Sequence, residues 1–212
     1  MGTAVKRQAD RTRQKLLGCA FEEIHKNGFR AASLDAILEK SGVTKGALYH
    51  HFENKAELGY AVVDEIVRPF IEENWRPAAE ADNVLDAAIH LCKHLTQTRS
   101  AMALSCGCPF NNLINEMSPV DEGFRTRLNG ILKDWRLGIV KAFKTGQAKG
   151  QVRKDVNAAD SAAFIIGAIE GCVGMGKATQ SRELLESSFR GLVDYLEHLR
   201  PASASASARP RG

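Results

Sequence analysis

The chain has 212 residues, 44% of them hydrophobic and 25% charged, which is the composition of an ordinary folded protein with a sizeable core. Its formal net charge of +4 is too small to indicate a nucleic-acid partner by itself, and five scattered cysteines favour reduced thiols in the cytoplasm over a disulfide framework. We expect neither a secretory signal nor a membrane span, because no apolar run approaches the roughly 18 residues that a span needs.

The first predicted helix carries one apolar stripe between Leu16 and Ile24, at helical spacing. It should end at Gly28, which can adopt the left-handed conformation of a helix C-cap. Five basic residues and one acidic residue lie in residues 1–15, so the positive charge is concentrated directly before this stripe. We therefore expect a basic N-terminal arm.

Three shorter helices should follow. Ser33 is predicted to cap the first of them, and Gly42 to end it. Thr44 should cap the next helix, and Asn54 should open a fourth. Pro69 should kink or end this fourth helix, because proline lacks the backbone N–H that a helix interior needs.

A second group of helices is predicted after residue 80. Ser118 resembles the start of a capping box, with Pro119 at the first helical position. The spans expected are 82–100, a short helix after the segment CGCP, 118–150, 158–178 and 181–199. No strand pattern occurs, so the fold class is all-α. The low-complexity segment 201–212 is expected to be disordered.

The stretch SGVTKGALYHHFENKAEL (residues 41–58) has the pattern of a helix-turn-helix, in which a glycine turn joins two short helices. Polar residues at the start of the second helix would face bases and phosphates, and the helix dipole there favours phosphate. The outward residues are Thr44, Lys45, Gly46, Tyr49 and His50, with Lys55 beside them. The alternative is a solvated helix face with two caps.

The longer segment GFRAASLDAILEKSGVTKGALYHHFENKAEL resembles the DNA-binding signature of TetR-family transcriptional regulators over about residues 10–60. The resemblance implies an all-helical homodimer with a three-helix DNA-binding head at 1–54 and an effector-binding and dimerisation domain at 55–200. Carried over by position, the DNA-binding residues would be Ser33, Thr44, Lys45, Gly46, Ala47, Tyr49, His50 and Lys55. Ala32 stands where relatives often have Thr, which weakens the expectation of a contact there.

Two further expectations concern residues beside this signature. His51 should be partly packed and support the head rather than contact DNA. In the basic arm, Lys6, Arg7 and Arg11 are candidates for contacts to phosphate, although such charge can equally be solvating.

The last two predicted helices suit close packing between helices. An apolar seam at spacings of three and four is formed by Leu185, Phe189, Leu192, Leu196 and Leu199. Backbones could approach in the helix before it at Gly167, Gly171 and Gly174. The family resemblance implies a four-helix dimer interface, and the alternative is an internal core stripe.

The segment CGCPFNNLINEMS, followed by FRTRL, resembles the NemR-like subgroup of TetR regulators, whose members respond to electrophiles or oxidants through cysteine. By this resemblance Cys108 is the candidate sensing thiol, with Cys106 beside it. Both thiols lie at the expected start of a short helix, where amide dipoles stabilise a thiolate. The alternative is a pair of inert core cysteines.

A conventional apolar effector pocket is the other hypothesis for the C-terminal part. Its candidate lining residues are Phe110, Trp135, Ile139 and Phe143, each of which is equally suited to a plain core. A metal sensor using His90 and His94 with Cys92 is disfavoured, since such a pair is more often polar surface. The segment GCVGMGKA lacks the Ser or Thr of a phosphate-binding loop, so no cofactor is expected.

The helix-turn-helix pattern and the family resemblance together predict a ligand-responsive transcriptional regulator rather than an enzyme. We expect a cytoplasmic homodimeric repressor that a small molecule or electrophile releases from a palindromic operator in double-stranded DNA. The alternatives are a thiol-reactive enzyme, for which no cofactor loop or catalytic arrangement is evident, and a dimeric ligand-binding module that does not bind DNA.

Overall fold

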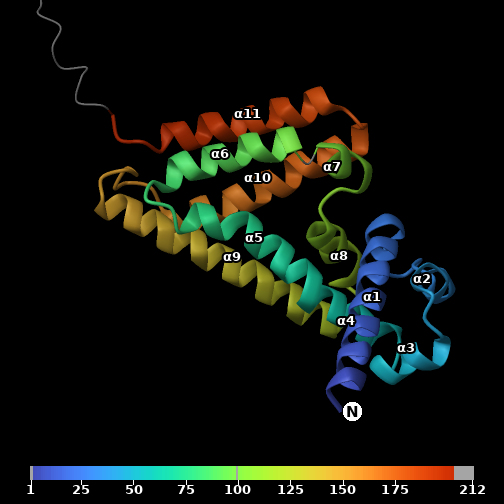
Figure 1. Cartoon of the computed structure of the whole chain (residues 1–212). Coiled ribbons are helices and arrows are strands. Elements are labelled where there is room, and N and C mark those ends of the chain that lie inside the picture. Colours follow the sequence, from blue (N-terminus) through green and yellow to red (C-terminus); the bar gives the residue numbers. More distant parts are fainter. Residues whose placement is uncertain (1, 99, 203–212) are drawn as a thin grey trace, which may run out of the picture. The chain divides into compact units, whose positions relative to one another are not determined.

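The structure, a computed structural model, describes residues 2–98 and 100–202, with side chains described except at residues 2–6, 98, 100, 102 and 103. Throughout these ranges the regular elements are helices and no strand is found, so the all-α prediction is confirmed (Figure 1). In chain order the helices are α1 (Gly2–Asn27), α2 (Leu34–Ser41), α3 (Lys45–His51), α4 (Lys55–Val62), the π-helix η1 (Val63–Val67), α5 (Arg68–Ala79), α6 (Val84–Thr98), α7 (Ser100–Cys106), α8 (Pro109–Met117), α9 (Glu122–Ala148), α10 (Ala158–Thr179) and α11 (Arg182–His198).

The chain forms two compact units. The first, called here the head unit, contains the residues up to Glu73 together with Ser105–Asp134, and the second, the core unit, contains Asn74–Leu104 and the residues from Trp135 onward. This division differs from the boundary after residue 54 predicted from the sequence. The difference arises because α8 packs with η1 and the first half of α9 packs with α4 and the turn after α1, for example through the edge-to-face rings of Phe29 in that turn and Phe124, whose centroids are 4.6 Å apart.

The predicted helix starts in the head unit are confirmed by side-chain caps. The oxygens of Ser33 and Thr44 accept hydrogen bonds from the backbone N–H groups of Ala36 and Ala47, both at 3.3 Å. Asn54 caps α4 in the same way, accepting from the backbone N–H of Glu57 at 3.0 Å. These caps satisfy backbone donors that the first turn of a helix leaves unpaired.

The helix does not end at Pro69. Instead, the turn before it widens into η1, where the backbone N–H of Arg68 bonds to the carbonyl of Val63, five residues back. Since the proline ring crowds the carbonyl of the preceding turn and donates no hydrogen bond, a widened turn lets the chain continue directly into α5.

The predicted start of the long helix at Ser118 is wrong. Ser118 closes α8, because its N–H bonds to the carbonyl of Ile114 at 3.3 Å. The cap of α9 is Asp121, whose carboxylate accepts from the N–H of Phe124 at 3.0 Å. An aspartate after a proline turn therefore takes the capping position. The short helix α7 was not predicted.

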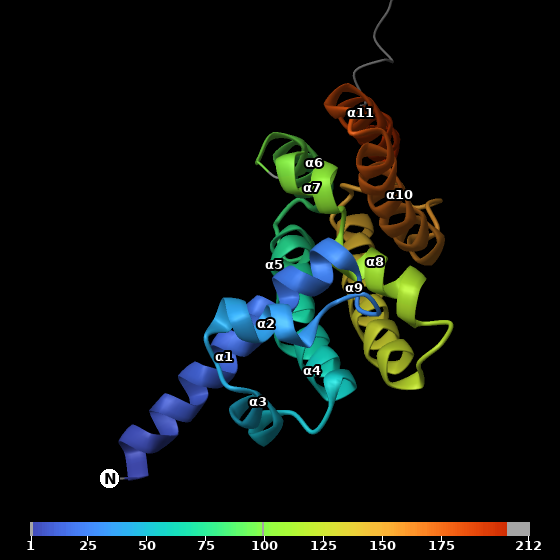
Figure 2. The same cartoon turned by 90° about the vertical axis from the view of Figure 1, so that its right-hand side faces the viewer.

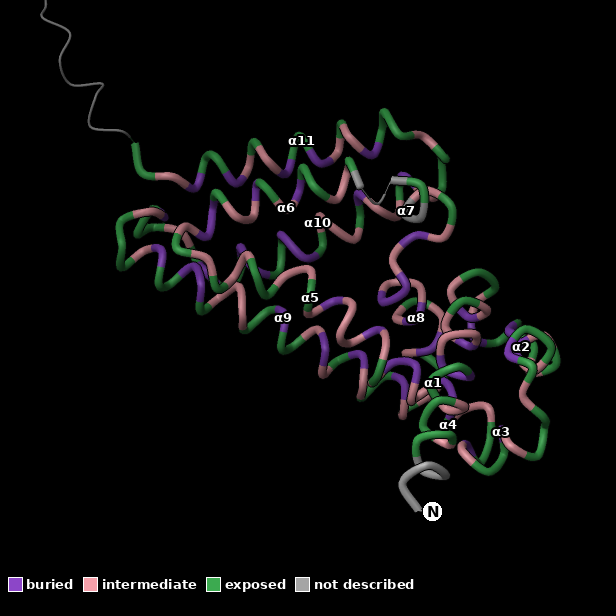
Figure 3. Tube along the Cα trace, in the orientation of Figure 1, coloured by how far each residue is buried: buried purple, intermediate pink, exposed green. Residues whose placement is uncertain are grey.

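In the core unit α11 packs against both α6 and α10 (Figure 1). The seam residues of α11, predicted to form a dimer interface, instead lie inside this unit: Leu185, Phe189, Leu192, Leu196 and Leu199 are all at most 5% exposed. They pack against apolar residues of α6 and α10 within one buried cluster. The seam is thus a core stripe, and Figure 3 shows α11 alternating between buried and exposed residues.

The opposite face of α10 and α11 is apolar and exposed. Phe164, Met175 and Leu184 are 53%, 46% and 37% exposed. Glycines at 167, 171, 174 and 191 have no atom within 4 Å of an added Cβ, so the surface around them is open. By length and composition α10 would also qualify as a membrane span, but a core helix passes the same test, and α10 has one face packed on α11.

Candidate nucleic-acid interface

The turn between α2 and α3 is held by a buried serine. Gly42 adopts φ +61°, a left-handed conformation that glycine reaches without strain. The Ser41 hydroxyl, fully buried, donates to the carbonyl of Leu38 at 3.2 Å and accepts from the N–H of Val43 at 3.3 Å. Ser41 therefore ties the end of α2 to the start of α3. Its place directly before the Gly-Val turn was the available sequence clue, and it was missed.

Helix α3 separates an inward apolar face from an outward polar face. Leu48 is 1% exposed and Phe52, at the C-terminal end, is 4% exposed. The outward residues, all exposed, are Thr44, Lys45, Gly46, Tyr49 and His50. Ala47 is half-buried at the side of this face. Five of the predicted DNA-binding residues are thus brought together on one exposed surface.

Two features suit this surface to close approach by a ligand. Gly46 has no atom within 4 Å of an added Cβ, so the first turn of α3 is open. Tyr49, a large aromatic residue, remains 44% exposed. A helix N-terminus with exposed lysine, tyrosine and histidine can accept phosphate and contact base edges.

His51 is partly packed, which agrees with the burial predicted for it. It is half-buried, and burial lowers its pKa, with smaller contributions in the same direction from His50 and Arg13. The lowered pKa favours the neutral imidazole, whose ring centroid lies 5.4 Å from that of His50 and 6.3 Å from that of Phe52.

Arg13 acts as a clamp inside the head unit. Its guanidinium lies 5.1 Å from the centre of the Phe52 ring at the end of α3 and forms a two-pronged ion pair with Glu65 of η1. This ion pair lowers the pKa of Glu65. Arg13 was assigned to the basic arm by its sequence position, but it joins α1, α3 and η1.

The basic arm is helical, since α1 begins at Gly2. Arg7, Arg11 and Lys15 are exposed at spacings of four and so follow one side of α1. The Lys15 ammonium lies 3.9 Å from the position of an added Cβ at Gly42, which places this stripe beside the helix-turn-helix. Figure 2 shows the first turns of α1 extending beyond α2 and α4. The side chain of Lys6 lies outside the described residues.

Two other positions from the family signature are engaged inside the head. The Lys55 ammonium donates to the carbonyl of Arg30 at 3.1 Å and lies 5.0 Å from the centre of the Phe29 ring. Ser33 remains exposed at the start of α2, whereas Ala32 is only 5% exposed. The Ala32 side chain is therefore core, in keeping with the weakened expectation of a contact there.

The candidate sensor residues divide between the two units. Cys106 ends α7 and Cys108 is the residue before α8, with Gly107 between them at φ +75°. Both cysteines are half-buried, and Phe110, in the first turn of α8, is 1% exposed. These three residues belong to the head unit.

The other three candidates are core side chains of the second unit. Trp135 and Phe143 are 5% and 1% exposed, and Ile139 is half-buried against the main apolar cluster. None of the six candidates lines the pocket of about 380 Å³ found in this unit. The pocket therefore lies away from the residues predicted to bind the effector.

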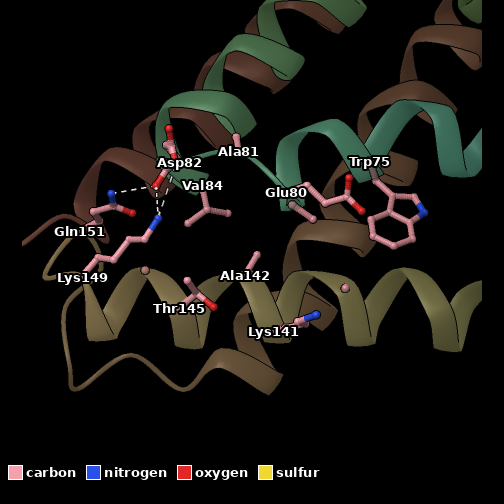
Figure 4. A pocket seen from close by; sticks show the side chains of 13 residues that line it. Trp75, Glu80, Ala81, Asp82, Val84, Lys141, Ala142, Thr145, Lys149 and Gln151 are labelled. Carbon is pink, nitrogen blue, oxygen red and sulfur yellow. Dashed lines mark hydrogen bonds and ion pairs between the residues drawn. The ribbon is translucent and has the colours of Figure 1, made fainter.

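The pocket lies between the end of α5, the loop after it and α9 (Figure 4). Trp75 forms one wall, and an added Cβ at Gly138 would lie 2.1 Å from its ring, so glycine makes room for the indole. At the other end the carbonyl of Asp82 accepts from Lys149 at 3.2 Å and Gln151 at 2.9 Å. Neither Trp75 nor Gly138 was predicted, because their pairing requires two helices that are distant in sequence to meet.

The metal-sensor alternative finds little support in the geometry. His90 and His94 are exposed on α6, and Cys92 is 2% exposed in the core. Burial, with a contribution from Cys172, raises the pKa of Cys92 to about 12. Within residues 2–98 and 100–202 no three His, Cys, Asp or Glu side chains gather as a metal would require.

Two protein-family descriptions match the chain. Residues 16–62 match the bacterial regulatory proteins described as the tetR family, and residues 85–192 match a tetracyclin repressor-like C-terminal domain. The chain is 28% identical to an uncharacterized HTH-type transcriptional regulator in the lacX 3′ region of Lactococcus lactis subsp. lactis, over 84% of this chain and 89% of that protein. It is 26% identical to the HTH-type transcriptional repressor DhaR of Mycobacterium sp. (strain GP1), over 92% and 96% of the two chains.

Solved structures show the same fold. A transcriptional regulator of the TetR family from Cytophaga hutchinsonii is similar with a TM-score of 0.83 at 21% identity, covering 92% of this chain and 98% of that one. The reduced form of Escherichia coli NemR is similar with a TM-score of 0.75 at 19% identity, covering 91% and 99%. At these identities the likeness establishes the arrangement of helices.

Proposed function

The chain belongs to the TetR family and is a DNA-binding transcriptional regulator of the helix-turn-helix type, and from this premise we propose that it is a cytoplasmic homodimeric repressor released from a palindromic operator by an effector. The observation that carries the proposal is the exposed face of α3, where Thr44, Lys45, Gly46, Tyr49 and His50 gather above a buried Leu48.

In this proposal α3 enters the major groove. Lys45 and Tyr49 contact phosphate or base edges, and His50 lies one turn into the helix. Ser33 and Thr44 use their hydroxyl oxygens to cap α2 and α3, which leaves their protons to donate to phosphates. Ala47 borders the same groove, while Lys55 supports the α1–α2 turn and can share its ammonium with a phosphate.

The proposed dimer uses the exposed apolar face of α10 and α11. Phe164, Met175 and Leu184 supply contact area, and the open surface at Gly167 and Gly171 lets a second pair of helices approach closely. Two-fold pairing places two α3 helices on successive major grooves, which is why a palindrome is the expected site. The buried seam of α11 takes no part.

For effector sensing we retain Cys108 as the proposed reactive thiol. It directly precedes α8, whose amide dipoles stabilise a thiolate, whereas Cys106 stands at the carbonyl end of α7. A conventional ligand in the pocket of about 380 Å³ beside Trp75 is the second candidate.

The first experiment is selection of binding sites from random duplex DNA by the reduced protein. We expect an enriched inverted repeat, and Lys45→Ala and Tyr49→Ala should each weaken binding to it by about tenfold or more. Lys144→Ala, which removes an exposed lysine of α9 in the core unit, serves as the matched control. No enrichment at low salt from folded dimeric protein would favour the alternatives, a DNA-independent ligand-binding module or a thiol-reactive enzyme.

The basic stripe of α1 is tested on the same operator. Arg7→Ala and Arg11→Ala should each reduce the slope of log affinity against log salt by about one, because each contact to phosphate releases about one counterion. An unchanged slope removes that residue from the interface.

A further inference from the structure

Polar contacts join the segment Ser105–Asp134 to the N-terminal part of the head unit. On the α9 side, the Tyr60 hydroxyl donates to Asp121 at 2.8 Å, and Arg127 donates to Asp64 at 2.9 Å. These two contacts hold α4 and η1. A second set, from α8 and the loop before it, reaches a different part of the head, the end of α1 and the turn that follows.

The centre of this second set is the carboxylate of Glu116 on α8. One oxygen accepts from the backbone N–H of Phe29 and the other from that of Arg30, both at 2.8 Å. Two successive amides thus point at one charged group, which makes both hydrogen bonds charge-assisted. Gly28, at φ +82°, is required here, since an added Cβ would lie 3.0 Å from the same carboxylate.

The turn that Glu116 holds connects α1 to α2 and, through it, to α3. It directly follows α1 and precedes α2, whose C-terminal end is joined to α3 by the Ser41 and Gly42 turn. Phe29, at the middle of the turn, is 8% exposed and packs edge-on against Phe124. The Glu116 carboxylate thus holds the backbone from which α2 starts.

Helix α8 also begins at the proposed sensing segment. Cys108 precedes its first residue, and the carbonyl of Gly107, between the two cysteines, accepts from Nε2 of His25 on α1 at 2.9 Å. The nine residues of α8 thus form a short rigid connection from the Cys106–Cys108 loop to Glu116. Both ends of this connection contact α1 or the turn after it.

We propose that Glu116 is a positioning residue for operator binding, and that α8 transmits the state of the Cys106–Cys108 loop to the α1–α2 turn. The second part rests on the proposed function. With Glu116 on the two amides, α2 and α3 are held in the operator-binding orientation. Modification of Cys108 displaces the start of α8, the carboxylate leaves the amides, and the head is no longer held for DNA.

The positioning role is tested with Glu116→Gln, which keeps the shape of the side chain but replaces one accepting oxygen with a donor that faces an amide N–H. We expect operator affinity to fall by about tenfold or more, and hydrogen exchange at the Phe29 and Arg30 amides to accelerate. Glu116→Asp should recover part of both. Glu122→Gln, an exposed carboxylate of the same segment that pairs with Arg125, is the matched control.

Helical content and thermal unfolding of each variant separate misfolding from loss of position. A folded Glu116→Gln protein with unchanged affinity overturns the proposal. Unchanged exchange at the two amides overturns it as well, since the hydrogen bonds would then not depend on the carboxylate.

Transmission is tested with N-ethylmaleimide on the otherwise unmodified protein. The sulfur of Cys108 adds across the maleimide double bond, and the proton lost by the thiol ends on the adjacent carbon, so no oxidant is involved. We expect loss of operator binding together with faster exchange at Phe29 and Arg30, both abolished in Cys108→Ser. In Glu116→Gln the remaining affinity should change little on treatment.

The outcomes also distinguish this inference from thiol sensing itself. Loss of DNA binding on treatment, with protection at Phe29 and Arg30 intact, supports sensing and overturns transmission through α8. Binding that survives complete modification of Cys108 overturns thiol sensing and transmission together. In that case weak binding by Glu116→Gln still supports its positioning role.

Discussion

The head unit and the core unit both bury an apolar core, but in the head unit long-range polar contacts also hold the helix-turn-helix. In the head unit, residues far apart in sequence meet through directional polar contacts, such as Glu116 with the amide of Phe29 and Arg13 with Glu65. The core unit is built around a buried apolar cluster of α6, α10 and α11 that includes Phe189, and its long-range polar contacts, such as Arg200 with Asp86, lie at the ends of these helices. Apolar burial is non-directional, whereas a hydrogen bond is either made or broken within a small displacement. This difference fits the proposal of a switchable head on a constant dimer scaffold.

The largest expected contrast is between the thiols of the two units. Burial raises the pKa of Cys92 to about 12, above its ordinary value of 9.0, so this thiol supplies far less thiolate than an unperturbed thiol. Iodoacetamide at pH 8 should therefore label the half-buried Cys106 and Cys108 in native protein and Cys92 only in denaturant, as followed by peptide mass spectrometry. Equal labelling of Cys92 and Cys108 in native protein would contradict the assignment of Cys92 to a closed core.

The second test removes an aromatic ring from the core unit. Phe189→Ala should lower the free energy of unfolding by about 3–5 kcal/mol, because the ring is 3% exposed and its loss leaves a cavity. Urea unfolding at one fixed protein concentration measures this. Phe164→Ala is the matched control, because the Phe164 side chain is 53% exposed on α10. This variant should keep the fold while weakening dimerisation. If Phe164→Ala proves the more damaging to helical content, the two faces have been assigned the wrong way round.

The third test adds a methyl group to the head unit. An added Cβ at Gly59 would lie 2.4 Å from the Phe29 ring and 2.7 Å from the Phe124 ring, so Gly59→Ala should destabilise the protein by about 1–3 kcal/mol. Gly18→Ala, in the interior of α1 with no atom within 4 Å, should stabilise by about 0.5–1 kcal/mol. Thermal unfolding measures both. A Gly59→Ala variant as stable as the parent would show that the rings around Phe29 are loosely packed.

The smallest effect is the pH dependence of the Arg13–Glu65 ion pair. Arg13 lowers the pKa of Glu65 below its ordinary value of 4.5, so the stability it adds is fully present above pH 4.5 and is lost as the pH falls through the lowered pKa. The two side chains are 31% and 36% exposed, which limits the contribution to under about 1 kcal/mol. Urea unfolding between pH 6 and 3 should show a smaller acid loss for Glu65→Gln than for the parent. Equal losses of stability at acid pH in the variant and the parent would show that the ion pair makes no net contribution to stability.

Several features of the head could be predicted because they depend on neighbouring residues. The caps at Ser33, Thr44 and Asn54 act within three residues, and the glycine at position 42 marks its own turn. The outward face of α3 follows from helical periodicity once Leu48 is assigned inward. For the same reason the family signature could be identified from one stretch of sequence.

Features that join distant segments were missed or misassigned. The α11 seam has the same apolar spacing whether it meets α6 of its own chain or a second copy, so periodicity could not choose between core and interface. From its sequence position Arg13 could not be distinguished from the other basic residues of the arm, because its partner Glu65 lies 52 residues away. The pairing of Trp75 with Gly138 likewise has no local signature.

By itself the sequence determined the all-helical class, the helix-turn-helix and its exposed residues, because caps, turns and amphipathic periodicity act over a few residues. The tertiary structure alone decided that residues 105–134 belong with the head and that Glu116 meets the amides of Phe29 and Arg30. A carboxylate on an amphipathic helix can face solvent equally well. Nothing in the local sequence therefore indicates that Glu116 pairs with the amide of Phe29, 87 residues away. Packing of Phe124 against Phe29 brings that partner within hydrogen-bonding distance.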